Sequence, residues 1–499
     1  MALKQSWIES DFLSEISDEK GLFEHAEKNN LIELNIHKEN YKDIIALADY
    51  LCVKNVDPII DGILKAFDYD FNILHSFEDF YKLSRRIKTF TDTPSLKKAI
   101  TTWIKNPVQG YLLYGYISYW DVSNIQDMRH VFKQTVFNED LSKWDVSNVT
   151  HMGSMFKQST FNRELPWNVS NVKDMSWMFY GAEFNSDIHS WDVHNVEDMS
   201  SMFRKSKFNQ DISAWDVSNV DDMSYLFSNS VFNQDLGSWN VSKVEHMVSM
   251  FANSCFNQKI GLWDVSRVTD MSFMFASSGF KEQIGQWDVS RVTKMVSMFE
   301  SSRFNQSIEW WDVGNVLDMS SMFYKSLFCQ EIGAWNVSNV EDMRTMFYKS
   351  AFDKAIGLWD VSNVFRMTAM FTRSPFNQDL GAWDVSRVVR MDGMFSMTPF
   401  NQDIGAWNVS KVTHMNYMFY NSAFHKDIRR WDTRRVVYAD YMFAYSELAY
   451  NLSYNLSPDM SHVMYAEHRF AYGPYACDKP YNRIAKYIFN IENRISSLT

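Results

Sequence analysis

Cysteine, proline and glycine are scarce in this chain of 499 residues, which contains 4, 9 and 17 of them respectively. With 46% hydrophobic and 22% charged residues, the composition excludes a collagen-like chain and a disordered polymer. The cysteines Cys52, Cys255, Cys329 and Cys477 show neither a Cys-x-x-Cys motif nor a pairing pattern. This argues against a disulfide framework or a zinc knuckle and predicts free thiols in a reducing compartment.

Long hydrophobic runs are also missing. The first residues, MALKQSWIESDFLSEISDEKGL, lack the apolar core of a secretory signal. No window approaches the roughly 18 uninterrupted apolar residues of a membrane-spanning helix. We therefore expect an intracellular, soluble protein that does not insert into a membrane.

Positive charge is in deficit, since 49 Lys and Arg face 61 Asp and Glu, for a net charge of −12. Such a balance argues against a polybasic groove for nucleic acid and against a patch for anionic membranes. The expected partner is a protein whose identity the sequence does not specify, and no nucleic acid is expected.

Aromatic residues and methionine are abundant, with 38 Phe, 24 Tyr, 18 Trp and 29 Met, and they follow a period. Fourteen tryptophans from Trp120 to Trp431 are 24 residues apart, except for one interval of 23 that ends at Trp167. We expect a loop contraction around Pro166 to absorb the missing residue. A fixed period of this length predicts a solenoid of repeated units.

Each unit repeats the same apolar positions, which we number from its tryptophan as position 0. Position 5 is Ile or Val and position 12 is Phe in all fourteen units, while Met fills most of positions 8 and 11. We read these columns as the buried core. The predicted core residues of two representative units are Trp215, Val220, Met223, Phe227, Trp239 and Phe251.

The apolar spacing in the second half of a unit, Val217 to Phe227, is helical or 3₁₀-like and predicts a short helix. The first half, typified by FNQDI, predicts a strand of three or four residues between turns. The predicted fold class is therefore an α/β repeat, a leucine-rich-repeat-like solenoid of about fourteen 24-residue units.

Polar positions in the first half also repeat. Asn follows the Phe that lies seven residues before the tryptophan, or six before Trp167, in nine units, and Asp or Asn follows the tryptophan in all fourteen. We expect the first set to form an asparagine ladder that satisfies backbone groups, and the second to stabilise turns.

The position before each tryptophan varies and becomes apolar in the middle of the array. If it faces outward it forms an exposed stripe for a partner, with Trp310 as anchor, and if it faces inward it adds to the core. The predicted partner-binding residues are Leu262, Gln286, Trp310 and Leu358.

A second variable position, position 4, carries two basic runs, which can be either a solvated ridge or a site for an acidic partner. The runs consist of Lys243, Arg267 and Arg291, and of Arg387, Lys411 and Arg435.

Sequence signatures of catalysis are missing: there is no GxGxxG, GxxxxGK[ST], HExxH or GxSxG motif. His151, His246 and His414 share one position but belong to distant units, so they cannot share a metal. We expect no enzymatic activity, no cofactor and no bound metal.

The repeated segments WDVSNVTHMGSMF (144–156), WDVSNVDDMSYLF (215–227) and FNQDLGAWDVSRV (376–388) resemble the BspA-like leucine-rich-repeat-like surface-antigen family. The resemblance covers about 95–445. It implies a curved solenoid that binds proteins and has no catalytic activity. Such repeats occur in bacteria, including mycoplasmas, in protists and in large DNA viruses of amoebae.

Four segments are expected: a helical module over 1–94, a helical cap over 95–119, the solenoid over 120–445 and a C-terminal cap over 446–499. Within the first, residues 40–67 resemble the C-terminal helices of BTB/POZ-type adaptor domains. The favoured hypothesis is a non-enzymatic scaffold that binds a protein. The alternatives are a substrate receptor of a ubiquitin ligase that uses the N-terminal helices, and a structural or surface component of a viral particle.

Overall fold

The computed structural model describes residues 88–450 and 457–461. The chain divides into two compact units, Met1–Val122 and Ser123–Thr499. The adaptor-like segment 40–67 lies outside the described residues, as do most of the predicted N-terminal module and most of the predicted C-terminal cap.

The described part of the first unit contains the helices α6 (Thr93–Lys105) and α7 (Pro107–Tyr114) and the 3₁₀ helix η2 (Ile117–Tyr119). A proline in the first turn favours the start of both α-helices because its φ is already helical. Asp92 caps α6, and its carboxylate accepts a hydrogen bond of 2.8 Å from the Ser95 N–H.

The two helices pack closely at Gly110. A Cβ atom at this position would lie 2.8 Å from the Cα of Trp103 in α6, so glycine permits the approach. Trp103 in turn makes an edge-to-face contact with Trp120, with ring centroids 6.0 Å apart. An aromatic cluster therefore forms the core of the described part of this unit.

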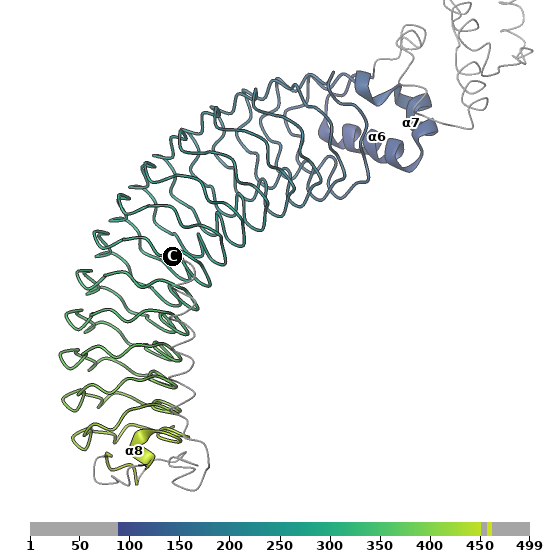
Figure 1. Cartoon of the computed structure of the whole chain (residues 1–499). Helices are drawn as coiled ribbons and strands as arrows, with labels where there is room; N and C mark the ends of the chain where they lie inside the picture. Colours follow the sequence, from purple (N-terminus) through teal and green to yellow (C-terminus); the bar gives the residue numbers. More distant parts are fainter. Residues whose placement is uncertain (1–87, 451–456, 462–499) are drawn as a thin grey trace, which may run out of the picture. The chain divides into compact units, whose positions relative to one another are not determined.

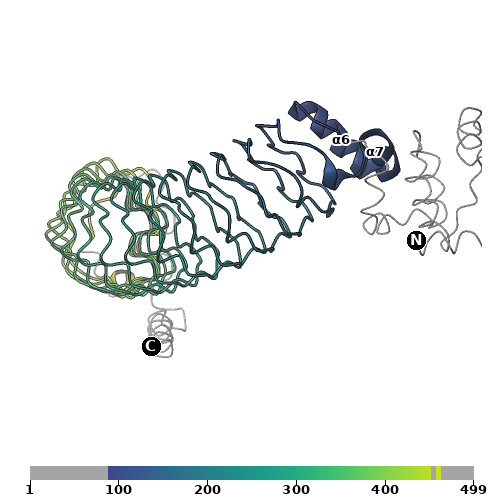
Figure 2. The same cartoon turned by 90° about the horizontal axis from the view of Figure 1, so that it is seen from above.

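The second unit is a solenoid of fourteen turns (Figure 1). Parallel bridges join position 7 of each turn to position 7 of the next, from Asp127 to Tyr438. Figure 2 shows the later turns nearly superimposed as closed loops. The predicted repeat solenoid is therefore present in the structure.

The second half of each turn is a series of tight turns, and the helix predicted there is wrong. In a typical unit the N–H groups of Met223, Tyr225, Phe227 and Asn229 each donate to a carbonyl of the next turn, at 2.7–3.0 Å. Of the intervening N–H groups, those of Leu226 and Ser228 donate to carbonyls three residues back, at 3.1–3.2 Å, and that of Ser224 donates to the Asp222 carboxylate at 2.7 Å. Left-handed backbone recurs at positions 10 and 14, where 26 residues other than glycine have φ of 51–64°. We call the surface formed by this half the ladder face, after its backbone hydrogen bonds between turns. The asparagine ladder lies in the other half of each turn and is not part of it.

The physical reason for the missing helix is the period of the apolar residues. Val217, Val220, Met223 and Leu226 recur every third residue, whereas an α-helix requires 3.6. A three-residue step matches the hydrogen bonds between residues i and i+3. The remaining N–H groups, which in a helix would donate to a carbonyl four residues back, donate instead to carbonyls of the neighbouring turn.

The first half of each turn is extended and forms no strand within the described repeats, so the predicted short strand is also wrong, and the α/β class is not confirmed. The predicted asparagine ladder is present. The side-chain oxygen of Asn209 accepts from the Asn233 N–H at 2.9 Å, and that of Asn233 accepts from the Asn257 N–H at 2.8 Å. Asp353 serves equally well, accepting from the Asn377 N–H at 3.0 Å.

The core is a stack of aligned side chains. Trp215, Val220, Met223, Phe227, Trp239 and Phe251 are buried. The Trp215 indole N–H donates to the carbonyl of Ile188 in the preceding turn at 3.2 Å. The expected contraction occurs at Pro166: only this residue separates Leu165 from Trp167, where other turns have two, and both flanking side chains stay buried.

Spacing between turns differs across the solenoid. Parallel backbone pairing holds the bridged positions about 4.8 Å apart. Phe203 and Phe227 at position 12 are separated by 5.8 Å, and Trp191 and Trp215 by 6.4 Å. Because the turns lie closer together at the ladder face, this face is on the concave side of the curved stack in Figure 1.

The array is followed by the short helix α8 (Glu447–Tyr450). None of the helices in the described part of the chain is long and apolar enough to span a membrane.

Loss of one rung of the asparagine ladder should destabilise the array. We expect Asn233→Ala to lower the free energy of unfolding by about 1–3 kcal/mol, because the Asn257 N–H loses its acceptor. Asn233→Asp should cost much less, since Asp353 fills the same role in its own turn. Urea denaturation of the two variants tests this, and equal losses would contradict the ladder's role.

Candidate binding surfaces

The row of residues that precedes the tryptophans faces solvent. Leu262 and Leu358 are each 95% exposed and Trp310 is 81% exposed, and Gln286 is also exposed. Of the two orientations that the sequence allows, the structure has the outward one. We call these four residues the outer row.

A β-turn presents each member of the outer row. The Trp311 N–H donates to the Ile308 carbonyl at 3.2 Å, so Trp310 occupies the corner of that turn while Trp311 is buried. The turn that carries Leu262 also needs Gly261, where a Cβ would lie 2.6 Å from the carbonyl oxygen of Gln283 in the next turn. The backbone thus fixes the direction of these side chains.

The outer row has a regular spacing along the stack. Leu262, Trp310 and Leu358 lie on every second turn. Successive tryptophan rings are 6.5 Å apart in this region, so the three side chains recur about every 13 Å. Their spacing suits a partner with apolar groups at similar intervals.

On the ladder face, an acidic region lies along positions 6 and 7 of successive turns, at the parallel bridges. It includes Asp174, Asp198 and Asp222 at position 7 and Asp221 and Glu245 at position 6. Burial raises the pKa of Asp198, and repulsion from Asp222 and Asp174 adds to the rise. Burial also raises the pKa of Asp221, with further repulsion from Asp222.

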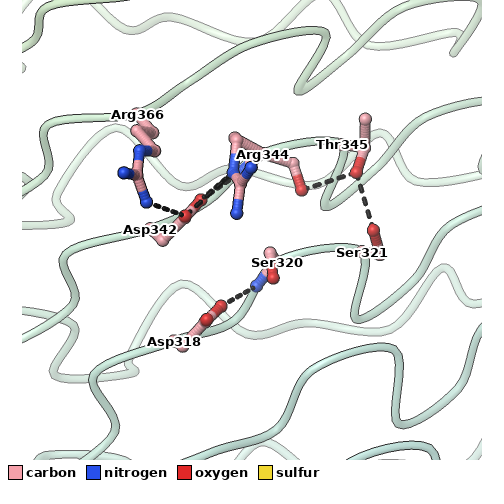
Figure 3. Close-up of polar contacts among 7 residues, drawn as sticks. All are labelled: Asp318, Ser320, Ser321, Asp342, Arg344, Thr345 and Arg366. Atoms are coloured by element: carbon pink, nitrogen blue, oxygen red, sulfur yellow. Dashed lines mark hydrogen bonds and ion pairs between the residues drawn. The ribbon is translucent and has the colours of Figure 1, made fainter.

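Further along the ladder face, charges pair with one another (Figure 3). The buried carboxylate of Asp342 contacts Arg344 Nε at 2.8 Å and Arg366 Nη1 at 3.2 Å. The hydrogen bond to Asp342 raises the pKa of Arg344. Ser321 and Thr345 share a hydroxyl hydrogen bond of 2.7 Å beside this cluster. The side chains of Arg344 and Arg366 thus both pair with the carboxylate of Asp342.

The basic runs at position 4 make contacts within the array. Lys243 hydrogen-bonds the side-chain oxygen of Asn219, and Arg267 pairs with Glu245 at 2.5 Å. Arg387 hydrogen-bonds the side-chain oxygen of Asn363. These contacts favour the solvated ridge over a site for an acidic partner.

Turn-stabilising acids behave as predicted. Asp216, directly after Trp215, accepts from the Ser218 N–H at 3.0 Å, and the Ser218 side chain and then this N–H lower the pKa of Asp216. Among the described residues, no group of three or more His, Cys, Asp or Glu is placed to bind a metal ion. His151, His246 and His414 occupy separate turns of the bridged position.

A group of cations and aromatic rings lies at positions 10 and 13 of the ladder face, around Tyr180, and could not be recognised from a local motif. Each cation is 20 to 24 residues away in sequence from the rings that it contacts. Alignment of the units column by column would have detected them, because Lys157, Tyr180 and Arg204 all occupy position 13.

A family model described as "Mycoplasma protein of unknown function, DUF285" matches the chain in five overlapping segments. They are residues 104–206, 159–255, 181–282, 252–355 and 349–457. Together they cover 104–457 without a gap, which is more than half of the chain. No curated protein and no solved structure matches it.

The pKa shifts predict opposite effects of two Asp→Asn changes. The pKa of Asp198 is raised, so its ionised form destabilises the fold, and this penalty is absent below about pH 4, where the acid is protonated in both the folded and unfolded states. We expect Asp198→Asn to raise the free energy of unfolding at pH 7 by up to about 1 kcal/mol, and the gain to vanish in acid.

Asp211 provides the matched control. Its pKa is lowered by the hydrogen bond from the Ser213 N–H, at 2.9 Å, so its ionised form stabilises the fold. Asp211→Asn should therefore destabilise the protein at neutral pH, and this loss should disappear as pH falls through the lowered pKa. Thermal denaturation of both variants between pH 3 and pH 8 checks the two signs, and shifts of the same sign at pH 7 would contradict the assignment.

Proposed function

Because the chain belongs to the DUF285 repeat family, whose members are described as proteins of unknown function, we propose that it is a non-enzymatic scaffold that binds a protein partner through the outer row. The observation that carries the proposal is the exposure of three large apolar side chains at one turn position. Soluble monomeric proteins rarely expose large apolar side chains in a regular row.

The chemistry of the outer row suits protein recognition. Trp310 offers a large, rigid contact surface, and tryptophan is enriched among the residues that contribute most to binding energy. Leu262 and Leu358 flank it two turns away on either side. Gln286 lies between Leu262 and Trp310 and can donate and accept hydrogen bonds at the rim of such a contact.

Two further features support this proposal. The repeats resemble the BspA-like, leucine-rich-repeat-like class, for which protein binding is the expected activity. The free cysteines Cys255 and Cys329 fit a reducing, intracellular location.

We expect the triple variant Leu262→Ala, Trp310→Ala and Leu358→Ala to lose the partner. Full-length tagged protein would be purified from its own cells, and co-purifying proteins identified by mass spectrometry. With a purified partner, Trp310→Ala alone should raise Kd by about thirtyfold or more, as for a residue that contributes about 2 kcal/mol or more.

Val136→Ala is the matched control, since Val136 is an exposed apolar residue outside the outer row. It should leave both the set of co-purifying proteins and Kd unchanged. Retention of every partner by the triple variant would refute the proposal.

A further inference from the structure

The ladder face carries a second feature that the outer row does not explain, the cationic–aromatic site formed by Lys157, Trp177, Tyr180, Arg204 and Tyr225. The ammonium nitrogen of Lys157 lies 3.8 Å from the ring centroid of Trp177 and 4.7 Å from that of Tyr180. The guanidinium carbon of Arg204 lies 4.4 Å from Tyr225 and 5.9 Å from Tyr180. Aromatic rings and cations thus alternate over four turns.

The backbone directs these side chains to the surface. Trp177 and Tyr225 occupy position 10, where the backbone is left-handed, while Lys157, Tyr180 and Arg204 occupy position 13 of three consecutive turns. All five are half-buried, so they are neither core residues nor freely solvated. Their contacts with one another hold them in place.

The positive charge of this site lacks an opposing carboxylate within the described residues. No ion pair of Lys157 or Arg204 is present there, and the nearest acid in sequence, Glu183, pairs with Lys207 at 2.5 Å. The Arg204 Nε atom is buried and has no hydrogen-bond partner. The pKa of Lys157 is lowered, first by burial and then by repulsion from Lys133. An anionic ligand would supply the carboxylate partner that the two cations lack.

The rings indicate what kind of anion fits. Their faces are already covered by cations, so they hold the charges in position and are not open platforms for stacking a base or a sugar. A ligand for this site must therefore supply anionic groups, and flat rings are not required of it.

The distances indicate an extended ligand. Lys157 and Arg204 both lie near Tyr180, within 4.7 and 5.9 Å of its centroid, so their charges are at most about 11 Å apart. In an extended peptide, side chains two or three residues apart are separated by about 7–10 Å. Carboxylates at such a spacing can reach both cations at once.

A related arrangement, with its rings at position 13 and its cations at position 14, recurs further along the ladder face. Lys325 lies 5.0 Å from the ring of Tyr324 and Lys349 lies 5.6 Å from that of Tyr348, and the two tyrosines stack at 4.8 Å. Burial and then repulsion from Arg373 lower the pKa of Lys349. Two separate clusters of this composition in a chain of net charge −12 make a chance gathering of surface lysines a poor explanation.

We propose that the cationic–aromatic site binds an acidic peptide segment of a partner protein, extended along the ladder face, with its carboxylates on Lys157 and Arg204. The proposal does not depend on the outer row, because the two surfaces share no residue. It adds a charge-selective site for a flexible, Asp/Glu-rich segment to whatever the outer row binds.

The test uses the full chain and a fluorescein-labelled peptide of eight glutamates, with an octaglutamine peptide of the same length as the neutral probe. Fluorescence anisotropy at about 50 mM salt should show binding of the glutamate peptide alone. Lys157→Gln with Arg204→Gln should weaken it by about tenfold or more, since both charge-assisted contacts to the ligand carboxylates are removed. Lys157→Arg with Arg204→Lys should retain binding within about threefold.

Lys259→Gln with Lys411→Gln is the matched control, because it removes the same charge from exposed positions elsewhere on the array. It should leave the affinity within about twofold of the parent. An equal loss in this control would show that only net charge matters and would overturn the proposal. So would failure of the glutamate peptide to bind, or tighter binding of a labelled oligothymidylate that depends on the same two residues.

The outer-row triple variant separates this proposal from the proposed function. It should bind octaglutamate as the parent does, even if it loses its co-purifying partner. Circular dichroism on each variant confirms that the fold is retained, so a loss of binding reports on the site.

Discussion

The fold depends on one constraint: backbone groups in the second half of each turn must find partners in the next turn at a fixed distance. The N–H groups at positions 8, 10, 12 and 14 do this, as the bonds from Met223, Tyr225, Phe227 and Asn229 illustrate. Identical backbones then impose identical side-chain stacks, which explains why one position is Phe in every unit. On the tryptophan side, indole N–H hydrogen bonds join the turns, and the ring centroids of successive tryptophans are farther apart, at 6.4 Å. Curvature results from that difference in spacing.

Two surfaces with different chemistry result from this arrangement. The outer row consists of corner residues of β-turns and is apolar around Trp310. The ladder face carries charge in regions: acids near Asp198, a paired cluster at Asp342, and cations held by rings around Tyr180. An apolar row contributes affinity through burial, whereas charged regions contribute selectivity and faster encounter. Under the two proposals above, the outer row would hold a folded partner and the cationic–aromatic site a flexible acidic segment.

Much of the solenoid could be predicted from the sequence because the 24-residue period assigns each residue to a fixed position in its unit. The buried columns, the asparagine ladder and the contraction at Pro166 all follow from aligned units. The helix predicted in the second half of each turn is wrong because apolar residues recur there every third residue, as in Val217, Val220 and Met223. This spacing is close to the 3.6-residue period of an α-helix but does not equal it. The direction of the outer row could not be predicted, since Leu262 or Trp310 is equally apolar whether it faces the core or solvent. The cationic–aromatic site was missed because cation–ring contacts between turns join residues such as Lys157 and Tyr180 that no local motif connects.

The left-handed residues at positions 10 and 14 carry a consequence for how such proteins can diversify. In a left-handed conformation a residue other than glycine costs roughly 1–2 kcal/mol, yet 26 positions accept it here, with side chains as different as Ser, Lys, Tyr and Trp. The cost comes mainly from the contact between Cβ and the backbone, which side chains unbranched at Cβ share, and it is higher for a β-branched residue. Exchanging one unbranched side chain for another therefore leaves the scaffold's energy almost unchanged, so the concave surface can acquire new specificities by substitution at these positions while the architecture beneath it stays constant.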